Sequence, residues 1–531
     1  MISKPRAGPR MFHGARGGGK VSRYNMGEYL IGVDAGTTGC KTCVFTLDGH
    51  IKGDDYREYP SYYPNPGWVE QIPEDLVPAV FASCKAALGN SGVKPGDILA
   101  LAISTQGSVV GLLDARGKLI RPFIGWQDLR GSTDGTDYLL SRIPREKVYD
   151  IAGDPVGTVF TNTKFAWVKL HEPDNWRKTA MFSTHQDYFL REFGADGYYT
   201  DLSSASRDGL LDIDRAVWSE ELHEALGIPL NKRPAVLTGP GEVICRIPQA
   251  VAEKTGLLAG TPLCLGAHDQ NCSTFGAGGV SHGAAVLVMG TFGSCFVVTD
   301  KSVRDPNRKL VVKNNHGVGN YTIEAFSNTA ASSYRWYRDT FCDYEKAEGK
   351  RLGEDPYDLV GAQIEAAGPG ANGVTFLPYL QGASGVRLNS RARGAFTGMT
   401  LGTSKGEMAR AVMEGICYEM YDIIRAEIDA GVEIDAIRLS GGAAKSKLWR
   451  QMMSDIFKRP IMRLSTSETG CLGAALYAGV GACVYRGCAD AALRAVHITE
   501  TNEPDHSRAA AYDEAYDRFS RVYDALESRE Y

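Results

Sequence analysis

The sequence predicts an α/β protein made of two similarly built halves, and three observations support this. The chain has 531 residues, whereas one compact domain usually holds about 100–200. Segments with the apolar period of strands alternate along the chain with segments that have the period of helices, which is typical of α/β proteins. A strand, a Gly-Thr turn and a second strand begin at Leu30, and the same pattern begins again at Ala285.

The first 25 residues differ from the rest of the chain. They contain basic residues but no acidic residue, and they lack the apolar core of a secretory signal. Met26 stands directly before the first strand and is a plausible start. We therefore expect residues 1–25 to be a disordered leader without function. A transit peptide, or an extension that comes from a vector or a wrongly assigned start, is the alternative.

The first elements after this leader predict a β-meander. Residues 29–33 and 42–46 have strand composition, and Asp48-Gly49 is a strong hairpin signal. Further on, residues 74–88 have the spacing of an amphipathic helix and residues 98–104 form a buried strand. Residues 109–120 predict a hairpin around Ala115-Arg-Gly.

The second half predicts a βαβ unit and a terminal helix. A strand ends at a glycine turn, Ser440-Gly-Gly, and a helix with apolar residues at helical spacing follows. Pro460 stops this helix, and residues 461–464 form the next strand. Residues 509–529 carry aromatic residues at helical spacing, which favours a packed C-terminal helix over a binding surface.

The composition excludes several classes of protein. Hydrophobic residues make up 43% and charged residues 23%, which is ordinary for a globular protein and excludes a disordered or fibrous chain. Lys and Arg number 58 against 63 for Asp and Glu, which gives a net charge of −5. Because this chain lacks the basic field of a nucleic-acid-binding protein, we expect no nucleic-acid partner.

The lengths of the apolar segments and the number of cysteines indicate the cellular compartment. No window approaches the roughly 18–20 apolar residues of a membrane-spanning helix, so we expect no membrane span. Twelve cysteines are too few for a disulfide scaffold in a chain of this length. Cys40 and Cys43 have the spacing of a redox or zinc pair, but on an extended segment they face opposite sides, so we interpret them as core residues. A reducing cytoplasm is the simplest compartment.

Turns rich in Gly and Thr follow predicted strands at three places. They begin at Asp34, Gly290 and Ser440. Glycine lets backbone amides approach an anion, threonine adds hydroxyl donors, and a helix N-terminus adds a favourable dipole. Three such turns suit a polyphosphate. The alternative is three ordinary turns in a chain with 61 glycines.

Two acidic residues accompany these turns. Asp34 and Asp269 each close a buried strand, where a carboxylate is costly unless it binds a metal or accepts hydrogen bonds. Lys41 follows the first turn and could neutralise phosphate charge. One carboxylate for magnesium and another as general base is what phosphoryl transfer needs. The alternative is that Asp269 or His268 only caps the following helix.

The ordered motifs of the chain resemble those of the FGGY carbohydrate kinases over residues 29–480. They are Asp34-x-Gly-Thr-Thr, Gly67-Trp-Val-Glu-Gln, Trp126-x-Asp-x-Arg130, Asp187-Tyr188, Gly266-x-x-Asp-Gln270, Gly290-Thr291, Leu377-Pro-Tyr379, Gly394-x-Phe-x-Gly398, Arg410-Ala-Val-Met-Glu-Gly415 and Ser440-Gly-Gly442. The resemblance implies two ribonuclease-H-like domains of the actin and hexokinase type around a central cleft. Residues 27–276 would form the sugar and phosphate side, and residues 277–531 would form the nucleotide side with the C-terminal helix.

The resemblance also implies roles for single residues. Asp269 would be the catalytic base for the sugar hydroxyl, and Asp34 would organise magnesium. Contacts to ATP are implied for Thr37, Thr38, Lys41, Gly290, Thr291, Gly441, Gly442 and Ala443. Contacts to the sugar are implied for Gln106, Trp126, Asp128, Asp187 and Gln270. Lys41 stands where relatives often carry Arg, and Asp128 could instead pin a loop by pairing with Arg130.

The segment that usually carries substrate identity departs from the known subfamilies. It follows the strand at 98–104 and reads Ser104-Thr-Gln106-Gly-Ser108, whereas glycerol kinases have Gln-Arg-Glu and many xylulokinases Gln-Met-His there. The small residues indicate a larger substrate or recognition by other loops. The segment Ser333–Cys342 resembles the xylulokinase and autoinducer-2 kinase branches.

We therefore expect ATP- and magnesium-dependent phosphorylation of a primary hydroxyl on a small linear sugar or polyol, of the pentulose type such as xylulose. An autoinducer-2 kinase, which acts on a linear dihydroxypentanedione, is the alternative within the family. From other classes, a sugar-independent ATPase or sensor and a silent sugar-binding relative remain open. The resemblance leaves room for a homodimer.

Overall fold

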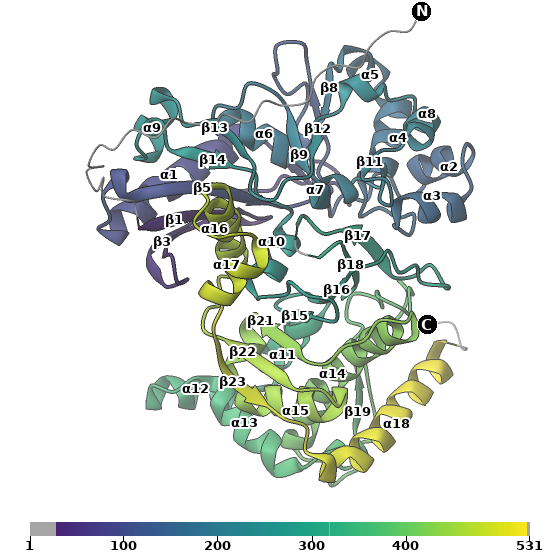
Figure 1. Ribbon diagram of the computed structural model, residues 1–531. Coiled ribbons are helices and arrows are strands. Elements are labelled where there is room, and N and C mark those ends of the chain that lie inside the picture. The colour runs from purple at the N-terminus through teal and green to yellow at the C-terminus, as the bar shows by residue number, and fades with distance from the viewer. Residues whose placement is uncertain (1–27, 318, 528–531) are drawn as a thin grey trace, which may run out of the picture.

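The computed structural model describes residues 28–317 and 319–527, and it contains two α/β lobes, one above the other in Figure 1. The leader predicted for residues 1–25 lies outside the described residues. No helix in the described part of the chain is long and apolar enough to cross a membrane. All twelve cysteines lie in the described ranges and are free, and Cys40 and Cys43 are buried, which confirms their interpretation as core residues.

Each lobe is organised around one large sheet. The first sheet has the strand order β13-β14-β5-β1-β2-β3, with β1 (Tyr29–Ala35), β2 (Gly39–Thr46), β3 (Ile51–Glu58), β5 (Ile98–Thr105), β13 (Val243–Arg246) and β14 (Pro262–Cys264). The second has the order β17-β18-β16-β15-β21-β22-β23, with β15 (Ala285–Met289), β16 (Gly293–Thr299), β17 (Val311–Asn314), β18 (Tyr321–Ser327), β21 (Ile437–Ser440), β22 (Ile461–Leu464) and β23 (Ile498–Asn502).

Six strands of the second sheet correspond in order and direction to the six strands of the first. In each, an antiparallel hairpin, β1-β2 or β15-β16, is extended on one side by another antiparallel strand, β3 or β18. On the other side two parallel strands follow, β5 and β14 or β21 and β22, and an antiparallel strand closes the edge. The second sheet adds β17. This repeat confirms the predicted α/β fold of two similar halves.

The remaining strands are short and pair in twos. They are β4 (Glu70–Gln71) with β7 (Phe123–Ile124), β6 (Gly111–Leu113) with β8 (Met181–Ser183), β9 (Tyr199–Asp201) with β12 (Ala235–Leu237), β10 (Leu211–Asp212) with β11 (Val217–Trp218), and β19 (Thr375–Leu377) with β20 (Ala395–Thr397). The hairpin predicted around Ala115-Arg-Gly is confirmed, because Leu113 and Leu119 form an antiparallel bridge and the N–H of Ile120 donates to the carbonyl oxygen of Leu112 at 2.8 Å. The sequence did not predict that β6 also pairs with the distant β8, a contact that lies among buried apolar side chains.

Helices cover the sheets and connect the lobes. In the first half they are α1 (Pro73–Ser91), α2 (Asp134–Leu140), α3 (Arg145–Ala152), α4 (Thr161–His171), α5 (Pro173–Lys178), α6 (His185–Glu192), α7 (Leu202–Ser206), α8 (Glu220–Leu226), α9 (Gln249–Thr255) and α10 (Asp269–Gly276). In the second they are α11 (Ala330–Phe341), α12 (Asp343–Leu352), α13 (Pro356–Ala367), α14 (Lys405–Asp429), α15 (Lys447–Phe457), α16 (Thr469–Gly481), α17 (Cys488–Ala495) and α18 (Ala509–Glu527). The predicted terminal helix and the predicted βαβ unit, β21-α15-β22, are both confirmed.

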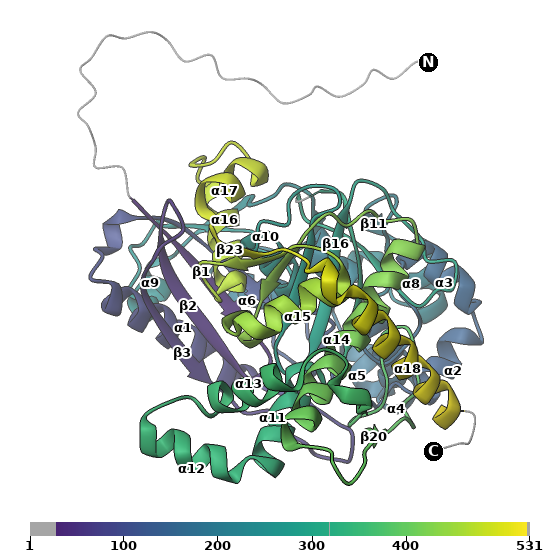
Figure 2. The same cartoon turned by 90° about the horizontal axis from the view of Figure 1, so that it is seen from below.

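Local sequence explains where the main helices begin and end. Helix α1 has proline at its first position, acidic residues in its first turn and the left-handed Gly92 at its end, all of which favour these boundaries. Helix α14 begins with a capping box between Ser404 and Glu407. Helices α14, α15 and α18 lie side by side on the second lobe (Figures 1 and 2).

The lobes are joined where α10 and α16 cross. Helix α16 comes from the second half of the chain but packs on β1 and β5 of the first sheet (Figure 1). Glycines allow this approach, because a Cβ on Gly32 would lie 1.8 Å from the carbonyl oxygen of Cys471 and a Cβ on Gly473 would lie 1.9 Å from that of Cys272. A second junction lies at β17, where the N–H of Val312 donates to the carbonyl oxygen of Gly153.

Candidate active site

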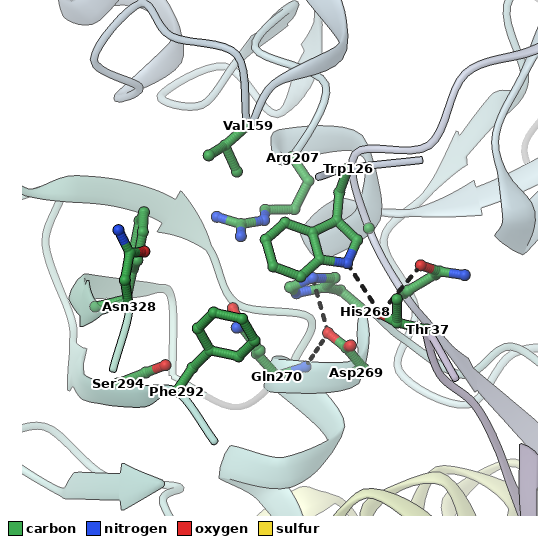
Figure 3. Close-up of a pocket in the computed structure, with 13 residues that line it drawn as sticks. Thr37, Trp126, Val159, Arg207, His268, Asp269, Gln270, Phe292, Ser294 and Asn328 are labelled. Carbon is green, nitrogen blue, oxygen red and sulfur yellow. Dashed lines mark hydrogen bonds and ion pairs between the residues drawn. The ribbon is translucent and has the colours of Figure 1, made fainter. Parts of the chain in front are cut away.

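A pocket of about 230 Å³ lies between the lobes, and residues from both line it (Figure 3). Its lining consists of Thr37, Gln106, Gly107, Trp126, Val159, Arg207, His268, Asp269, Gln270, Phe292, Ser294, Phe326 and Asn328. Five of these residues were predicted as site residues from the sequence. The rings of Trp126 and Phe292, one from each lobe, meet at an edge with their centroids 6.0 Å apart.

Asp269 is the one carboxylate in this lining, and it stands at the start of α10. Its Oδ1 lies 2.9 Å from Nε2 of His268 and accepts the N–H of Gln270 at 2.7 Å (Figure 3). Burial raises the pKa of Asp269, but His268, Arg207 and these hydrogen bonds outweigh burial, so the pKa lies below its usual range. The group is therefore an ionised carboxylate at neutral pH.

Asp34 ends β1 close to Asp269. Its Oδ1 accepts the hydroxyl of Ser104 at 2.8 Å. Burial, and then repulsion from Asp269, raise the pKa of Asp34 to about 7. Gly470 leaves room for this side chain, since a Cβ there would lie 2.7 Å from Oδ2 of Asp34.

These two carboxylates suit a magnesium ion. Their mutual repulsion would be relieved by a divalent cation. Among the described residues no group of three or more His, Cys, Asp or Glu side chains could hold a metal. Proteins usually hold magnesium with one or two carboxylates together with water and the phosphates of a substrate, and the role of Asp34 as such a carboxylate stays a prediction.

The threonine turn after β1 is fixed by side chains on the wall of the pocket. Nε1 of Trp126 donates to Oγ1 of Thr37 at 2.9 Å, and this hydroxyl donates to Oε1 of Gln106 at 3.3 Å. The amide of Gln106 in turn donates to Gln71 at 2.8 Å. The sequence did not single out Gln71, although it belongs to the Gly67-Trp-Val-Glu-Gln motif.

Two predicted sugar ligands lie outside the lining of the pocket. Asp128 is fully buried and accepts hydrogen bonds from the backbone of Val69 and from Arg130. Asp187 is fully buried as well and forms the capping box of α6 with Thr184. These contacts favour structural roles for both carboxylates, and their contact with a sugar stays a prediction.

Apart from Thr37, the predicted phosphate and nucleotide contacts are not part of the lining of the pocket. Thr38 is exposed in the first turn, and Lys41 pairs with Asp54 on the neighbouring strand. Gly290 and Thr291 form the turn between β15 and β16, and Gly441, Gly442 and Ala443 follow β21. Gly441 has a φ of +90°, which favours glycine.

Open space at two of these glycines is compatible with a close ligand. A Cβ on Gly442 would meet nothing within 4 Å, and one on Gly290 would meet only the carbonyl oxygen of Phe292 at 3.8 Å. Backbone at both turns is thus accessible to a phosphate or nucleotide.

Arg207 lines the pocket without having been predicted. Its guanidinium points toward the centre of the pocket in Figure 3 and pairs with Glu324 at 2.7 Å, and Lys313 pairs with the same carboxylate. The Nε of Arg207 is buried and has no hydrogen-bond partner among the described residues. A pairing between residues this far apart in the chain leaves no local sequence signal. The other residues of the lining that the sequence did not single out also come from distant parts of the chain; they are Val159, Phe292, Ser294, Phe326 and Asn328.

Comparison with known proteins identifies the family. The N-terminal domain model of the FGGY family of carbohydrate kinases matches residues 29–276, and the C-terminal domain model matches residues 285–482. The chain belongs to the FGGY family of carbohydrate kinases. It is therefore an ATP-dependent sugar kinase with the actin and hexokinase type of fold.

Relatives of the chain act on different substrates. It is 29% identical over 497 residues to a xylulose kinase of Bacillus subtilis (strain 168), which covers 93% of this chain and 97% of that protein. It is 30% identical over 466 residues to a glycerol kinase of Dechloromonas aromatica (strain RCB), which covers 85% and 89%. Its fold matches the crystal structure of a gluconate kinase from Lactobacillus acidophilus with a TM-score of 0.86 and 25% identity, over 94% of this chain and 99% of that one.

Proposed function

We propose that this sugar kinase transfers the γ-phosphoryl group of ATP to a primary hydroxyl of a small linear sugar or polyol. A pentulose such as xylulose is the first candidate. The observation that carries this proposal is the pocket between the lobes, where Asp269 is the one carboxylate and polar side chains surround it.

In the proposed reaction, Asp269 accepts the proton of the substrate hydroxyl. The hydroxyl oxygen bonds to the γ-phosphorus while the bond from this phosphorus to the bridging oxygen of ADP breaks. Trp126 and Phe292 narrow the pocket between the lobes, which helps to exclude water that would otherwise compete as acceptor. Gln106, Trp126 and Gln270 face the sugar.

Asp34 would hold magnesium, which supplies positive charge that stabilises the phosphates of ATP. Thr37 and Thr38 would bind the terminal phosphates from the first lobe, and Gly290 and Thr291 from the second. Gly441, Gly442 and Ala443 would lie against the nucleotide. Lys41 is a weaker candidate for the phosphates, because its ammonium group already pairs with Asp54.

An acidic sugar such as gluconate is a second candidate substrate. Arg207 places a buried cation in the lining of the pocket, and its unpartnered Nε could donate to a carboxylate. A kinase for the dihydroxypentanedione form of autoinducer-2 is a further candidate, which rests on the resemblance of the segment Ser333–Cys342.

A coupled assay of ADP release tests the proposal. The purified protein is given ATP and magnesium with xylulose, other ketoses, polyols, glycerol, gluconate or the autoinducer-2 precursor, and one sample receives no sugar. We expect strong stimulation by one compound, and xylulose first. A slow release of ADP that no sugar changes would contradict the proposal and favour a sugar-independent ATPase.

A further inference from the structure

Gly107 leaves the space that another pocket residue occupies. It follows Gln106 in the segment where the sequence departs from known subfamilies. A Cβ on Gly107 would lie 2.5 Å from Cδ2 and 2.7 Å from Nε2 of His268, and 3.1 Å from Cγ of Arg207. The first two distances are too short for real atoms, and the imidazole cannot keep its place if residue 107 carries a side chain.

The backbone holds His268 in this position. His268 forms a parallel bridge with Thr105 beyond the end of β14, which brings it beside the segment after β5. Its N–H donates to the hydroxyl of Ser203 at 3.1 Å. Its side chain is only 6% exposed, so the imidazole has little freedom to turn elsewhere.

In this place the imidazole contacts the carboxylate of Asp269. Nε2 of His268 lies 2.9 Å from Oδ1 of Asp269, within the distance at which a protonated Nε2 donates to a carboxylate. The only other hydrogen bond to this side chain in the described residues comes from the N–H of Gln270, on the same oxygen. Both contacts involve Oδ1, and Oδ2 accepts no hydrogen bond from the described residues, which leaves it available to a substrate hydroxyl.

A hydrogen-bond donor beside Asp269 would fix the orientation of its carboxylate in the proposed reaction. A freely rotating carboxylate would spend much of its time away from the substrate hydroxyl, whereas one held at Oδ1 keeps a fixed orientation. We propose that His268 is a positioning residue for Asp269, and that Gly107 is glycine because His268 occupies the space of its side chain. This inference rests on the proposed function of Asp269 as the base.

The test compares kcat and KM for the best sugar among four variants: His268→Ala, His268→Gln, Gly107→Ala and the double variant Gly107→Ala/His268→Ala. We expect His268→Ala to lower kcat about 100-fold, since misplacement of a reacting group by about 1 Å has an effect of this size. KM should change little, because His268 acts on Asp269 and not on ground-state binding. His268→Gln keeps an N–H donor of similar reach and should recover most of kcat.

The close approach of His268 and Gly107 allows a comparison of single and double variants that distinguishes a positioning role of His268 from a purely structural one. Gly107→Ala should lower kcat by itself, because it displaces the imidazole. In the His268→Ala background the same change should have little further effect, since the two shortest contacts, those with the imidazole, are gone and only the 3.1 Å approach to Cγ of Arg207 remains. His171→Ala is the matched control, because His171 also pairs with an aspartate, Asp134 at 2.9 Å, but on the exposed surface away from the pocket.

Three results would overturn the inference. They are a His268→Ala variant with wild-type kcat, a His268→Gln variant as slow as His268→Ala, and a Gly107→Ala effect that is undiminished in the His268→Ala background. Thermal unfolding identifies variants that do not fold, and the glutamine variant, which keeps the size of the side chain, then decides. Failure of the proposed function is distinguishable, because the wild-type protein itself would then show no sugar-dependent ADP release.

Discussion

At the residue scale, Asp269 is the catalytic base that we propose. We expect Asp269→Asn to lower kcat by about 100-fold or more, because a positioned general base contributes about 10²–10⁴-fold. The variant keeps the size of the side chain, so ATP binding should remain close to that of the wild-type protein. Steady-state kinetics and a nucleotide titration measure the two effects. Normal turnover in Asp269→Asn would remove the residue from the mechanism.

A variant of Asp128 distinguishes a carboxylate that contacts the sugar from one that stabilises the wall of the pocket. Its partner Arg130 is fully buried as well, and breaking a buried pair costs about 3–5 kcal/mol. We expect Asp128→Ala to lower the free energy of unfolding by about 3 kcal/mol, measured by chemical denaturation followed by tryptophan fluorescence.

The control for Asp128 is Asp174→Ala, which breaks a pair with Arg177 whose side chains are about 70% exposed. This change should have almost no effect on stability. An Asp128→Ala variant of unchanged stability and raised KM for the sugar would instead support the sugar contact that the sequence predicted.

Site residues could be predicted from the sequence only where they follow strands in recognisable motifs. Asp34 lies near the end of β1, Thr37 and Asp269 follow strands, and all three belong to motifs of consecutive residues. Arg207 and His268 could not be assigned in this way, because their roles depend on Glu324 and Gly107, which are distant in sequence. The sequence showed that Gly107 departs from the motifs of known subfamilies, but it did not show that the imidazole of His268 occupies the space of a side chain there.

At the element scale, α14 buries acidic residues that link stability to pH. Glu427 is fully buried and forms no ion pair in the described part of the chain. Burial raises its pKa to about 8. Between its ordinary pKa of 4.5 and this value, the folded protein keeps a proton that the unfolded chain has lost. The stability of the folded state therefore falls as pH rises from about 4.5 to 8.

Glu427→Gln should remove this dependence on pH. The melting temperature of the variant relative to the wild-type protein should be higher at about pH 9 than at about pH 5, because only the wild-type protein must ionise a buried group. Differential scanning calorimetry at the two pH values measures this. Glu433→Gln, at an exposed position just after α14, is the control and should show no such trend, and an equal difference at both pH values for Glu427→Gln would contradict the prediction.

The crossing of α10 and α16 should not tolerate a side chain at Gly473. A Cβ there would lie 1.9 Å from a carbonyl oxygen of α10, so Gly473→Ala must push the helices apart. We expect a lower melting temperature and, because Asp269 begins α10, a lower kcat. Gly361→Ala in α13 is the matched control, since nothing lies within 4 Å of that position and alanine favours a helix. Equal behaviour of the two variants would be evidence against a tight junction.

Local sequence predicted the helices and strands better than it predicted which of them pair or pack together. The boundaries predicted for the βαβ unit and the terminal helix agree with α15, β22 and α18 because period and capping are local properties. The pairing of β6 with β8 and the packing of α16 on the first sheet are contacts between distant segments, and no local pattern encodes them.

At the scale of the whole molecule, the repeat of two sheets explains why the site lies between them. Corresponding turns, after β1 and after β15, come from corresponding places in the two lobes, and Trp126 and Phe292 meet across the pocket. The domain boundary at residue 276, the homodimer and the cytoplasmic location stay predictions. We propose that this arrangement transfers a phosphoryl group to a sugar.

Analysis of the reaction product tests that claim most directly. The protein is incubated with ATP, magnesium and the sugar that stimulates it best, and the product is examined by mass spectrometry and by phosphorus NMR. We predict a sugar that has gained one phosphoryl group, with its phosphorus coupled to the two protons of a terminal methylene, and no such product from Asp269→Asn. Release of inorganic phosphate with the sugar unchanged would contradict the account.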